Sequence, residues 1–305
     1  MVPLRYNFQP QMATATIPLY DICSISKGNP GQELLVERFG AYLEKHYGQL
    51  HRPHRHSFYH LVLFTGGAGW HTIDFERYAV KPFQVYFMSP GQVHSWHFEK
   101  GVDGYIVHFN ERLFTSFLQN SHYLERFAFF SGAGPEAVCQ LPPAEQEGTV
   151  RLFETMLSEV GEGKEQNLDM IRLLLLQFFI TVDRTCIHQQ LPSVPPQKYV
   201  LLRNFQKLIE KYYRTIRLPK EYAELLYITP NHLNALCQNL LGKTAGDLIR
   251  DRVLLEAKRL LTNADMTITE VAYELAFQDN SYFNRFFKKY VGMTPDEFRK
   301  TFINP

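Results

Sequence analysis

The 305-residue chain lacks an excess of charge of either sign, with 32 Lys+Arg against 31 Asp+Glu and a net charge of +1. This balance excludes a chain that is a polyelectrolyte as a whole. Its hydrophobic content of 45% and charged content of 21% exclude long disorder and a fibrous repeat. At roughly 150 residues per domain, the length predicts about two domains.

Cysteine is scarce and scattered. The four cysteines are Cys23, Cys139, Cys186 and Cys237, and none forms a CxxC pair. This spacing argues against a disulfide framework and against a structural zinc site. We therefore expect a reducing compartment, the cytoplasm.

Long hydrophobic runs are also missing. The first twenty residues contain no apolar stretch of the kind found in secretion signals, so we expect no signal peptide. The most apolar window is Leu173–Val182, flanked by Arg172 and Asp183. It is too short for a bilayer, which needs about 20 apolar residues, so a buried helix is predicted and no membrane partner.

The overall balance conceals two different halves. Residues 197–305 carry 17 Lys+Arg and 12 Asp+Glu, a net +5, which leaves −4 for residues 1–196. Eleven of the twelve histidines precede residue 197. The seam Leu191–Gln197 contains three prolines, which disfavour helix and central strand, and is predicted to be a linker.

Short aromatic and β-branched segments alternate with glycine turns in the first half. They predict an antiparallel barrel or jelly roll. The expected strands are Phe58–Phe64, Gly69–Phe75, Phe83–Met88, His94–Phe98 and Gly104–Phe109.

Helices follow these strands at Glu111–Gln119, Pro143–Val160 and Leu168–His188. The last of them is apolar over most of its circumference. Either the barrel or a second subunit must therefore cover it.

The second half is predicted to be helical throughout. Thr229 and Pro230 are typical of the N-cap and first position of a helix that ends at Gly242. Thr267 or Thr269 should cap a helix to about Leu275, and Asp279 one that ends at Gly292. Further helices are expected at Leu201–Tyr213, Lys220–Leu226 and Ala245–Thr262, and from Pro295 onwards.

A short helix, a tight turn and a second helix occur twice, at Lys220–Leu241 and Ile268–Tyr290. Each second helix has apolar anchors at three- and four-residue spacing, namely Leu233, Leu236, Cys237 and Leu240, then Phe283, Phe287 and Tyr290. The opposite faces are polar: Asn231, Asn234 and Gln238, then Asn280, Ser281, Asn284, Arg285 and Lys288. Such helices fit the major groove, where amide and guanidinium groups read purine edges. An amphipathic surface helix without DNA is the simpler alternative.

The last 100 residues closely resemble the AraC-type transcription regulators. The matching residues are Ala257, Leu260, Leu261, Ile268, Val271, Ala272, Phe277, Asp279, Ser281, Tyr282, Phe283, Arg285, Phe287, Lys288, Gly292, Thr294 and Pro295. One departure is Ala276, where the family usually has glycine. A positive φ there would cost Ala about 1 kcal/mol.

The resemblance implies that one recognition helix from each copy enters successive major-groove segments. Base-facing positions would be Asn231, Asn234 and Ala235, then Asn280, Ser281 and Arg285. Arg suits guanine and Asn suits adenine. Lys243, Arg250, Lys288 and Lys289 would contact phosphates, while Lys258 belongs to a solvated face.

Nine histidines lie between residues 46 and 108. His54, His56 and His60, with His94 after Pro90-Gly91, resemble the two motifs of the cupin superfamily. His60, however, stands where metal cupins have a carboxylate, and the second motif is one residue shorter. Neutral histidines could still bind Zn²⁺, Fe²⁺ or Ni²⁺. We expect instead an organic effector carrying an acceptor group and no metal, bound by His54, His56, His60, His94 and Trp96, with Tyr86 a weaker candidate. Trp96 could equally be a core anchor.

Together these features predict an α+β chain. A cupin-like antiparallel β-barrel (1–142) is followed by a helical hairpin for dimerisation (143–190), a linker (191–197) and an all-α tandem helix-turn-helix domain (198–305, units 220–241 and 268–290). The function predicted is an effector-controlled transcription regulator, an activator, with no catalytic residues and no cofactor. Expected partners are direct-repeat promoter DNA, a small-molecule effector, a second copy and RNA polymerase. Two alternatives stay open: a metal-dependent cupin enzyme or metal sensor fused to a DNA-binding domain, and a regulator controlled by a protein partner, whose barrel would be filled by its own side chains.

Overall fold

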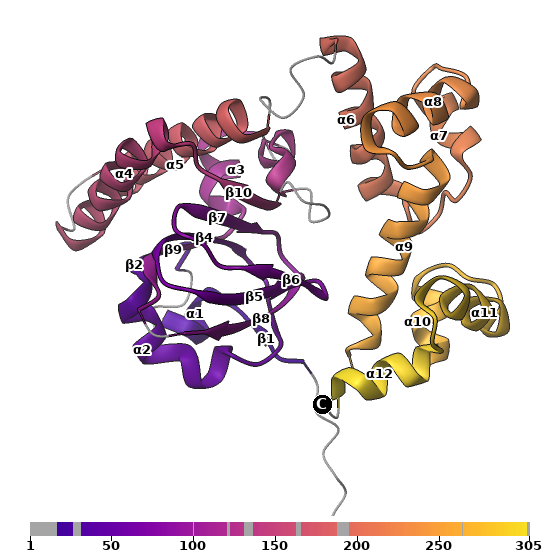
Figure 1. The fold of residues 1–305 in the computed structure, drawn as a ribbon, viewed down its shortest axis with the longest axis horizontal. Helices are drawn as coiled ribbons and strands as arrows, with labels where there is room; N and C mark the ends of the chain where they lie inside the picture. Colours follow the sequence, from indigo (N-terminus) through magenta and orange to yellow (C-terminus); the bar gives the residue numbers. More distant parts are fainter. Residues whose placement is uncertain are drawn as a thin grey trace, which may run out of the picture. The chain divides into compact units, whose positions relative to one another are not determined.

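The computed structural model (Figure 1) describes residues 17–26, 32–99, 101–120, 123–130, 137–162, 166–187, 195–263 and 265–303. Contacts divide the chain into two units, one of Pro18–Leu255 and one that contains Glu256–Pro305. Among the helices of the described ranges, none has the length and apolar character needed to cross a membrane.

Two five-stranded sheets form the first part of the chain. The first has the order β1 (Leu19–Tyr20), β3 (His54–His56), β8 (Val93–Phe98), β5 (Gly69–Ile73), β6 (Glu76–Ala79). The second has the order β10 (Val138–Gln140), β7 (Gln84–Met88), β4 (Tyr59–Gly66), β9 (Asp103–Phe109), β2 (Leu34–Arg38). All pairings are antiparallel except β1 with β3, so the predicted antiparallel fold is confirmed.

The second sheet is buried on both faces. On β4, Val62 and Phe64 belong to the core that includes Trp96 of β8. Their neighbours Leu61 and Leu63 belong to a separate core shared with the helices. Burial on both sides explains why the β4 sequence is apolar at successive positions rather than alternating.

Helices α4 (Pro143–Glu162) and α5 (Asn167–Val182) supply that second core, with Phe153, Phe178 and Phe179. The α-helical part of the predicted helix ends at Val182, and a π-helical turn, Asp183–Ile187, follows it directly. The last residue of the predicted helix, His188, lies outside the described residues. So does Leu191–Val194 of the predicted linker. The remaining helical elements here are α1 (Ile22–Ser26), α2 (Phe39–Leu50), α3 (Arg112–Leu118), η1 (Leu124–Arg126) and η2 (Ala128–Phe130).

In the described residues from 195 onwards, seven helices follow. They are α6 (Pro196–Tyr212), α7 (Pro219–Leu225), α8 (Pro230–Leu241), α9 (Ala245–Leu261), α10 (Ile268–Glu274), α11 (Asn280–Val291) and α12 (Pro295–Ile303). The prediction started α6 five residues late, because Pro196 occupies the first helical turn, where proline needs no N–H partner.

Side-chain caps set the starts of α8, α10 and α11. Thr229 Oγ1 accepts from His232 N at 3.2 Å, and the Asp279 carboxylate accepts from the amides of the first turn of α11. Thr267, rather than Thr269, caps α10 in a reciprocal box with Glu270. The predicted starts of α8, α10 and α11 are confirmed.

Candidate DNA-reading helices and effector site

Helix α8 presents one buried and one exposed face. Leu233, Leu236 and Cys237 are buried, as predicted. Asn231 and Ala235 lie on the exposed side. Their side chains are therefore accessible to a base edge.

Two other predicted readers of α8 have structural hydrogen bonds. Asn234 Oδ1 accepts from Ala245 N at 3.0 Å and so caps the first turn of α9. Gln238 Nε2 donates to the carbonyl of Gly242 at 3.2 Å, at the C-terminal end of α8. A bidentate contact with a base competes with this bond, whereas Asn234 Nδ2 and Gln238 Oε1 stay available for a single hydrogen bond to DNA.

Helix α11 is anchored by Phe283 and Phe287, which are fully buried. Tyr290, predicted as a third anchor, is 41% exposed and packs on Phe286 with ring centroids 5.3 Å apart. Val291, the next residue, is half-buried. The prediction for Tyr290 was wrong.

Arg285 is the most suitable base reader of α11. It is exposed and makes no hydrogen bond or ion pair with any residue in the described ranges. Ser281 and Lys288 are exposed on the same helix. By contrast, Asn284 Nδ2 donates to both the backbone oxygen and Oδ1 of Asn280 at 2.8 Å. Asn280 in turn donates to Thr269 Oγ1 at 3.1 Å, so these two predicted readers support each other.

Both helix-turn-helix turns use a residue with positive φ that is not glycine. Tyr227 has φ +56° and Ala276 has φ +55°. In each turn the next amide donates five residues back, from Ile228 to Ala223 and from Phe277 to Ala272. This is the Schellman motif, whose left-handed position normally carries glycine.

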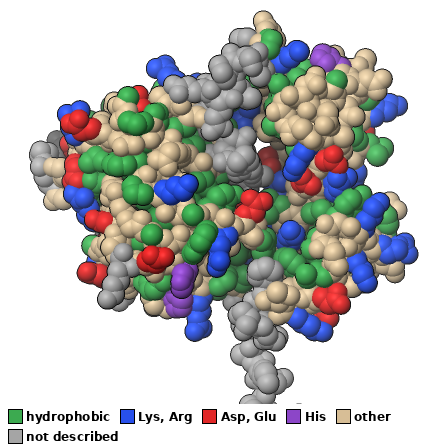
Figure 2. All heavy atoms as spheres, in the orientation of Figure 1, with side chains coloured by type: hydrophobic (Ala, Val, Ile, Leu, Met, Phe, Trp, Pro, Cys, Tyr) green, Lys and Arg blue, Asp and Glu red, His purple; other side chains and the backbone are tan. Residues whose placement is uncertain are grey.

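The predicted phosphate contacts divide into cations with an ion pair and cations that form none with the described residues. Lys243 Nζ lies 2.7 Å from Asp251, and Arg250 pairs with Asp247. Lys288 and Lys289 are exposed near the end of α11. Lys and Arg side chains recur over the surface of the C-terminal helices (Figure 2).

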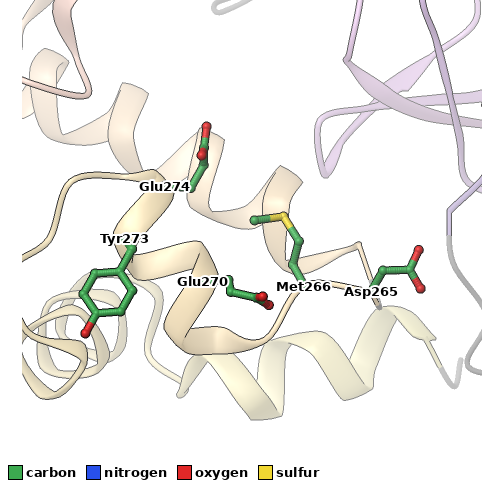
Figure 3. A pocket seen from close by; sticks show the side chains of 5 residues that line it. All are labelled: Asp265, Met266, Glu270, Tyr273 and Glu274. Atoms are coloured by element: carbon green, nitrogen blue, oxygen red, sulfur yellow. The ribbon is translucent and has the colours of Figure 1, made fainter.

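A hollow beside α10 has the opposite character. It is lined by Asp265, Met266, Glu270, Tyr273 and Glu274 (Figure 3). Three of these five residues are acidic, so phosphate is disfavoured beside this face.

The barrel interior contains a cluster of six histidines, and each of them is at most 2% exposed. Strand register brings them together, because His54 of β3 pairs with His94 of β8, and His60 of β4 pairs with His108 of β9. Trp96 is also buried, 5.3 Å from His94 between ring centroids. All five predicted effector residues therefore converge. The six members of the histidine cluster are His54, His56, His60, His71, His94 and His108.

His71 and His108 were missed by the sequence reasoning. Both share a strand face with residues of the barrel core, since His71 has the parity of Ile73 on β5 and His108 that of Ile106 on β9. Strand parity was the signal that could have identified them.

Burial lowers the pKa of every histidine in the cluster. The pKa of His54 falls to about 4 and that of His60 to about 3, in both cases chiefly through desolvation. The pKa values of the other four are lowered for the same first reason. The cluster is therefore uncharged at neutral pH.

Two family models match the chain. Residues 40–176 match the AraC-like ligand binding domain, and residues 222–301 match a helix-turn-helix domain. The transcriptional activator RhaR of Enterobacter sp. (strain 638) is 25% identical over 248 residues, which cover 81% of this chain and 86% of RhaR. RhaR of Yersinia pseudotuberculosis serotype O:1b is 21% identical over 264 residues, covering 82% and 85%. Among solved structures, wild-type ToxT from Vibrio cholerae with bound unsaturated fatty acid is 11% identical, with 90% of this chain and 98% of ToxT covered and a TM-score of 0.42.

Proposed function

Since the chain belongs to the AraC family of transcription regulators, we propose that it activates transcription by binding promoter DNA under the control of an effector. The observation that carries this proposal is the pair of capped helix-turn-helix units, each exposing polar side chains on its second helix. Asn231, Ala235, Ser281 and Arg285 are the base readers that the exposed faces favour. The effector binds the histidine cluster of the barrel and shifts the population of DNA-binding arrangements.

The domain plan follows the predicted boundaries except at the end of the linker. Residues 1–142 sense the effector and residues 143–190 join two protomers. The linker begins at residue 191 and ends at Pro195, because α6 starts at Pro196, and the helices from α6 onwards read direct repeats in promoter DNA. The cytoplasm is the expected compartment and RNA polymerase the expected protein partner. The comparisons with transcription regulators support a role without catalysis.

Dimerisation through the helical hairpin is supported by what the barrel leaves uncovered. Phe178 and Phe179 of α5 are buried against the second sheet. Leu173 and Met170 of the same helix are 53% and 44% exposed, and Val160 of α4 is 44% exposed. A two-fold contact between copies would remove these apolar side chains from water.

DNA selected from a random-sequence pool by the full chain tests the function directly. Arg285→Ala should lose about 1–3 kcal/mol of binding free energy on the selected site and relax preference at one base pair. Lys288→Ala should weaken binding to selected and random DNA alike and reduce the salt slope by about one.

Lys300→Ala is the matched control, because Lys300 is an exposed cation of α12, ion-paired with Asp296 at 2.6 Å. It should bind selected DNA as the unchanged chain does. Failure of the chain to enrich any sequence would contradict the proposed function. An equal loss on both DNA types for Arg285→Ala would remove Arg285 from the base readers.

A further inference from the structure

Three histidines in the barrel offer nitrogen atoms to one point. His54, His56 and His94 each present one ring nitrogen within 4.8 Å of the other two. The side chains of all three are at least 98% buried. They come from adjacent strands β3 and β8, so the sheet itself fixes their separation.

Hydrogen bonds determine which nitrogen of His54 is available. His54 Nδ1 lies 2.7 Å from the carbonyl oxygen of Arg52. A carbonyl can only accept, so Nδ1 carries the proton and the Nε2 of the neutral ring keeps its lone pair. His54 Nε2 is buried and has no hydrogen-bond partner among the described residues.

His94 is oriented in a similar way. Its Nδ1 lies 3.0 Å from His71 Nε2 and can donate a hydrogen bond to it. In that tautomer His94 Nε2 is unprotonated and keeps its lone pair. His94 Nε2 lies 3.5 Å from His56 Nε2. Metal-binding histidines usually have their second nitrogen held by such a neighbour, which fixes the ring and its tautomer.

The nitrogen atoms of His56 and His94 have the spacing of two ligands of a tetrahedral ion. Zn–N bonds of about 2.0–2.1 Å place two nitrogen ligands about 3.4 Å apart, close to the 3.5 Å between His56 and His94. Without an ion, His54 Nε2 is buried and has no partner among the described residues, which is costly.

The surrounding rings favour a small occupant. The ring centroids of His54 and His94 are 4.0 Å apart, and those of His56 and Phe58 are 4.5 Å apart. The ring centroid of His60 lies 5.1 Å from the ring centroids of both His56 and His94. Rings at these distances are in van der Waals contact, so an ion fits among them with less rearrangement than a molecule the size of a sugar.

We propose that His54, His56 and His94 bind one divalent late first-row transition-metal ion, with Zn²⁺ the best fit, and that this ion is the effector. The site supplies three neutral imidazole ligands and leaves a fourth position for water or an anion. This inference rests on the proposed function for its regulatory part, but the binding site stands on geometry alone. It replaces the metal-free organic effector that the sequence favoured.

The test uses the full chain freed of metal by a chelator. Titration with Zn²⁺ should show one equivalent bound and a raised melting temperature, and Co²⁺ should give the visible absorption of a tetrahedral site. The double change His56→Ala with His94→Ala should reduce Zn²⁺ affinity at least 100-fold. The single conservative changes His56→Gln and His94→Gln provide folded variants if the double variant does not fold. His97→Ala is the matched control, because His97 is exposed on the same strand as His94.

DNA binding to the selected site is then measured with and without Zn²⁺, and a severalfold change in affinity that disappears in His94→Gln supports the proposal. Absence of a stoichiometric site, or equal Zn²⁺ binding by the variants, overturns the metal site and leaves the DNA-binding function intact. Zn²⁺ binding that leaves DNA affinity unchanged overturns the effector role. Loss of specific DNA binding under all conditions overturns the proposed function while the metal site stands.

Discussion

Replacing Ala276 by glycine should stabilise the C-terminal helices. Ala276 is exposed at φ +55°, where the Cβ atom clashes with the backbone at a cost of about 1–2 kcal/mol. Glycine removes this strain but gains freedom in the unfolded chain worth about 0.4–1 kcal/mol. The net expected gain is therefore about 0–1.6 kcal/mol, centred near about 0.8 kcal/mol. The backbone hydrogen bonds of the turn remain, from Ala276 to Tyr273 at 2.8 Å and from Phe277 to Ala272 at 2.9 Å.

Urea unfolding followed by far-UV circular dichroism measures this gain as a shift of the midpoint at constant slope. Tyr227→Gly provides a second instance, because Tyr227 has φ +56° and is 96% exposed, so little packing is lost. Ala276→Val should destabilise, because β-branched residues tolerate positive φ least. If Ala276→Gly lowered stability while Ala276→Val did not, the left-handed turn conformation would be refuted.

Three further predictions concern the barrel and the assembly. In sedimentation, residues 1–196 should be dimeric and residues 197–305 monomeric, and the reverse result would contradict dimerisation through the helical hairpin. The pKa of His60 is about 3 when folded and about 6.5 when unfolded, so the unfolded chain binds the extra proton and stability falls as pH drops below about 6.5. His60→Gln should reduce the pH dependence of the free energy of unfolding by about 1.4 kcal/mol per pH unit between about pH 6 and 4. Urea unfolding in the presence of a chelator measures this dependence. An unchanged dependence would show that His60 does not titrate as described. Gly104→Ala should lower the free energy of unfolding by more than about 2 kcal/mol, because a Cβ atom there would lie 1.9 Å from the Leu63 carbonyl oxygen. Gly91→Ala is the control, since it has open space around it and should cost only about 1 kcal/mol. Equal losses would contradict the close approach of β4 and β9.

The sequence predicted the C-terminal helices well because local chemistry sets their ends. Thr229, Asp279 and Gly292 cap helices through bonds to residues only two to four positions away. Such signals need no knowledge of the tertiary fold. The first half depends on distant partners, so its elements were harder to identify.

Strand β2 and helix α2 illustrate that difficulty. β2 pairs with β9, whose residues are about 70 positions later, and nothing near Leu34–Arg38 announces that partner. Helix α2 contains two glycines and several aromatic residues with weak helix propensity, yet Phe39 and Tyr42 are completely buried in the barrel core. Tertiary packing, rather than local preference, explains this helix.

Four of the six members of the histidine cluster were predicted, and the other two were missed for the same reason. The HxH spacing and the parity of His60 follow from the local sequence, whereas the approach of His71 and His108 depends on strand order. Likewise, the hydrogen bond from Ala245 to Asn234 depends on how α8 meets α9. A contact between separate elements has no signature in either segment alone.

The hydrogen bond at Asn234 also bears on how this regulator can diverge. A substitution there alters the start of α9 together with any base contact, so a mutation at this position affects folding and recognition at once. Asn231 and Ala235 lie exposed on the same helix, and neither side chain forms a hydrogen bond of this kind with the described residues. After gene duplication, new operator preferences should therefore arise first at positions 231 and 235, while Asn234 changes late or together with a compensating change near Ala245.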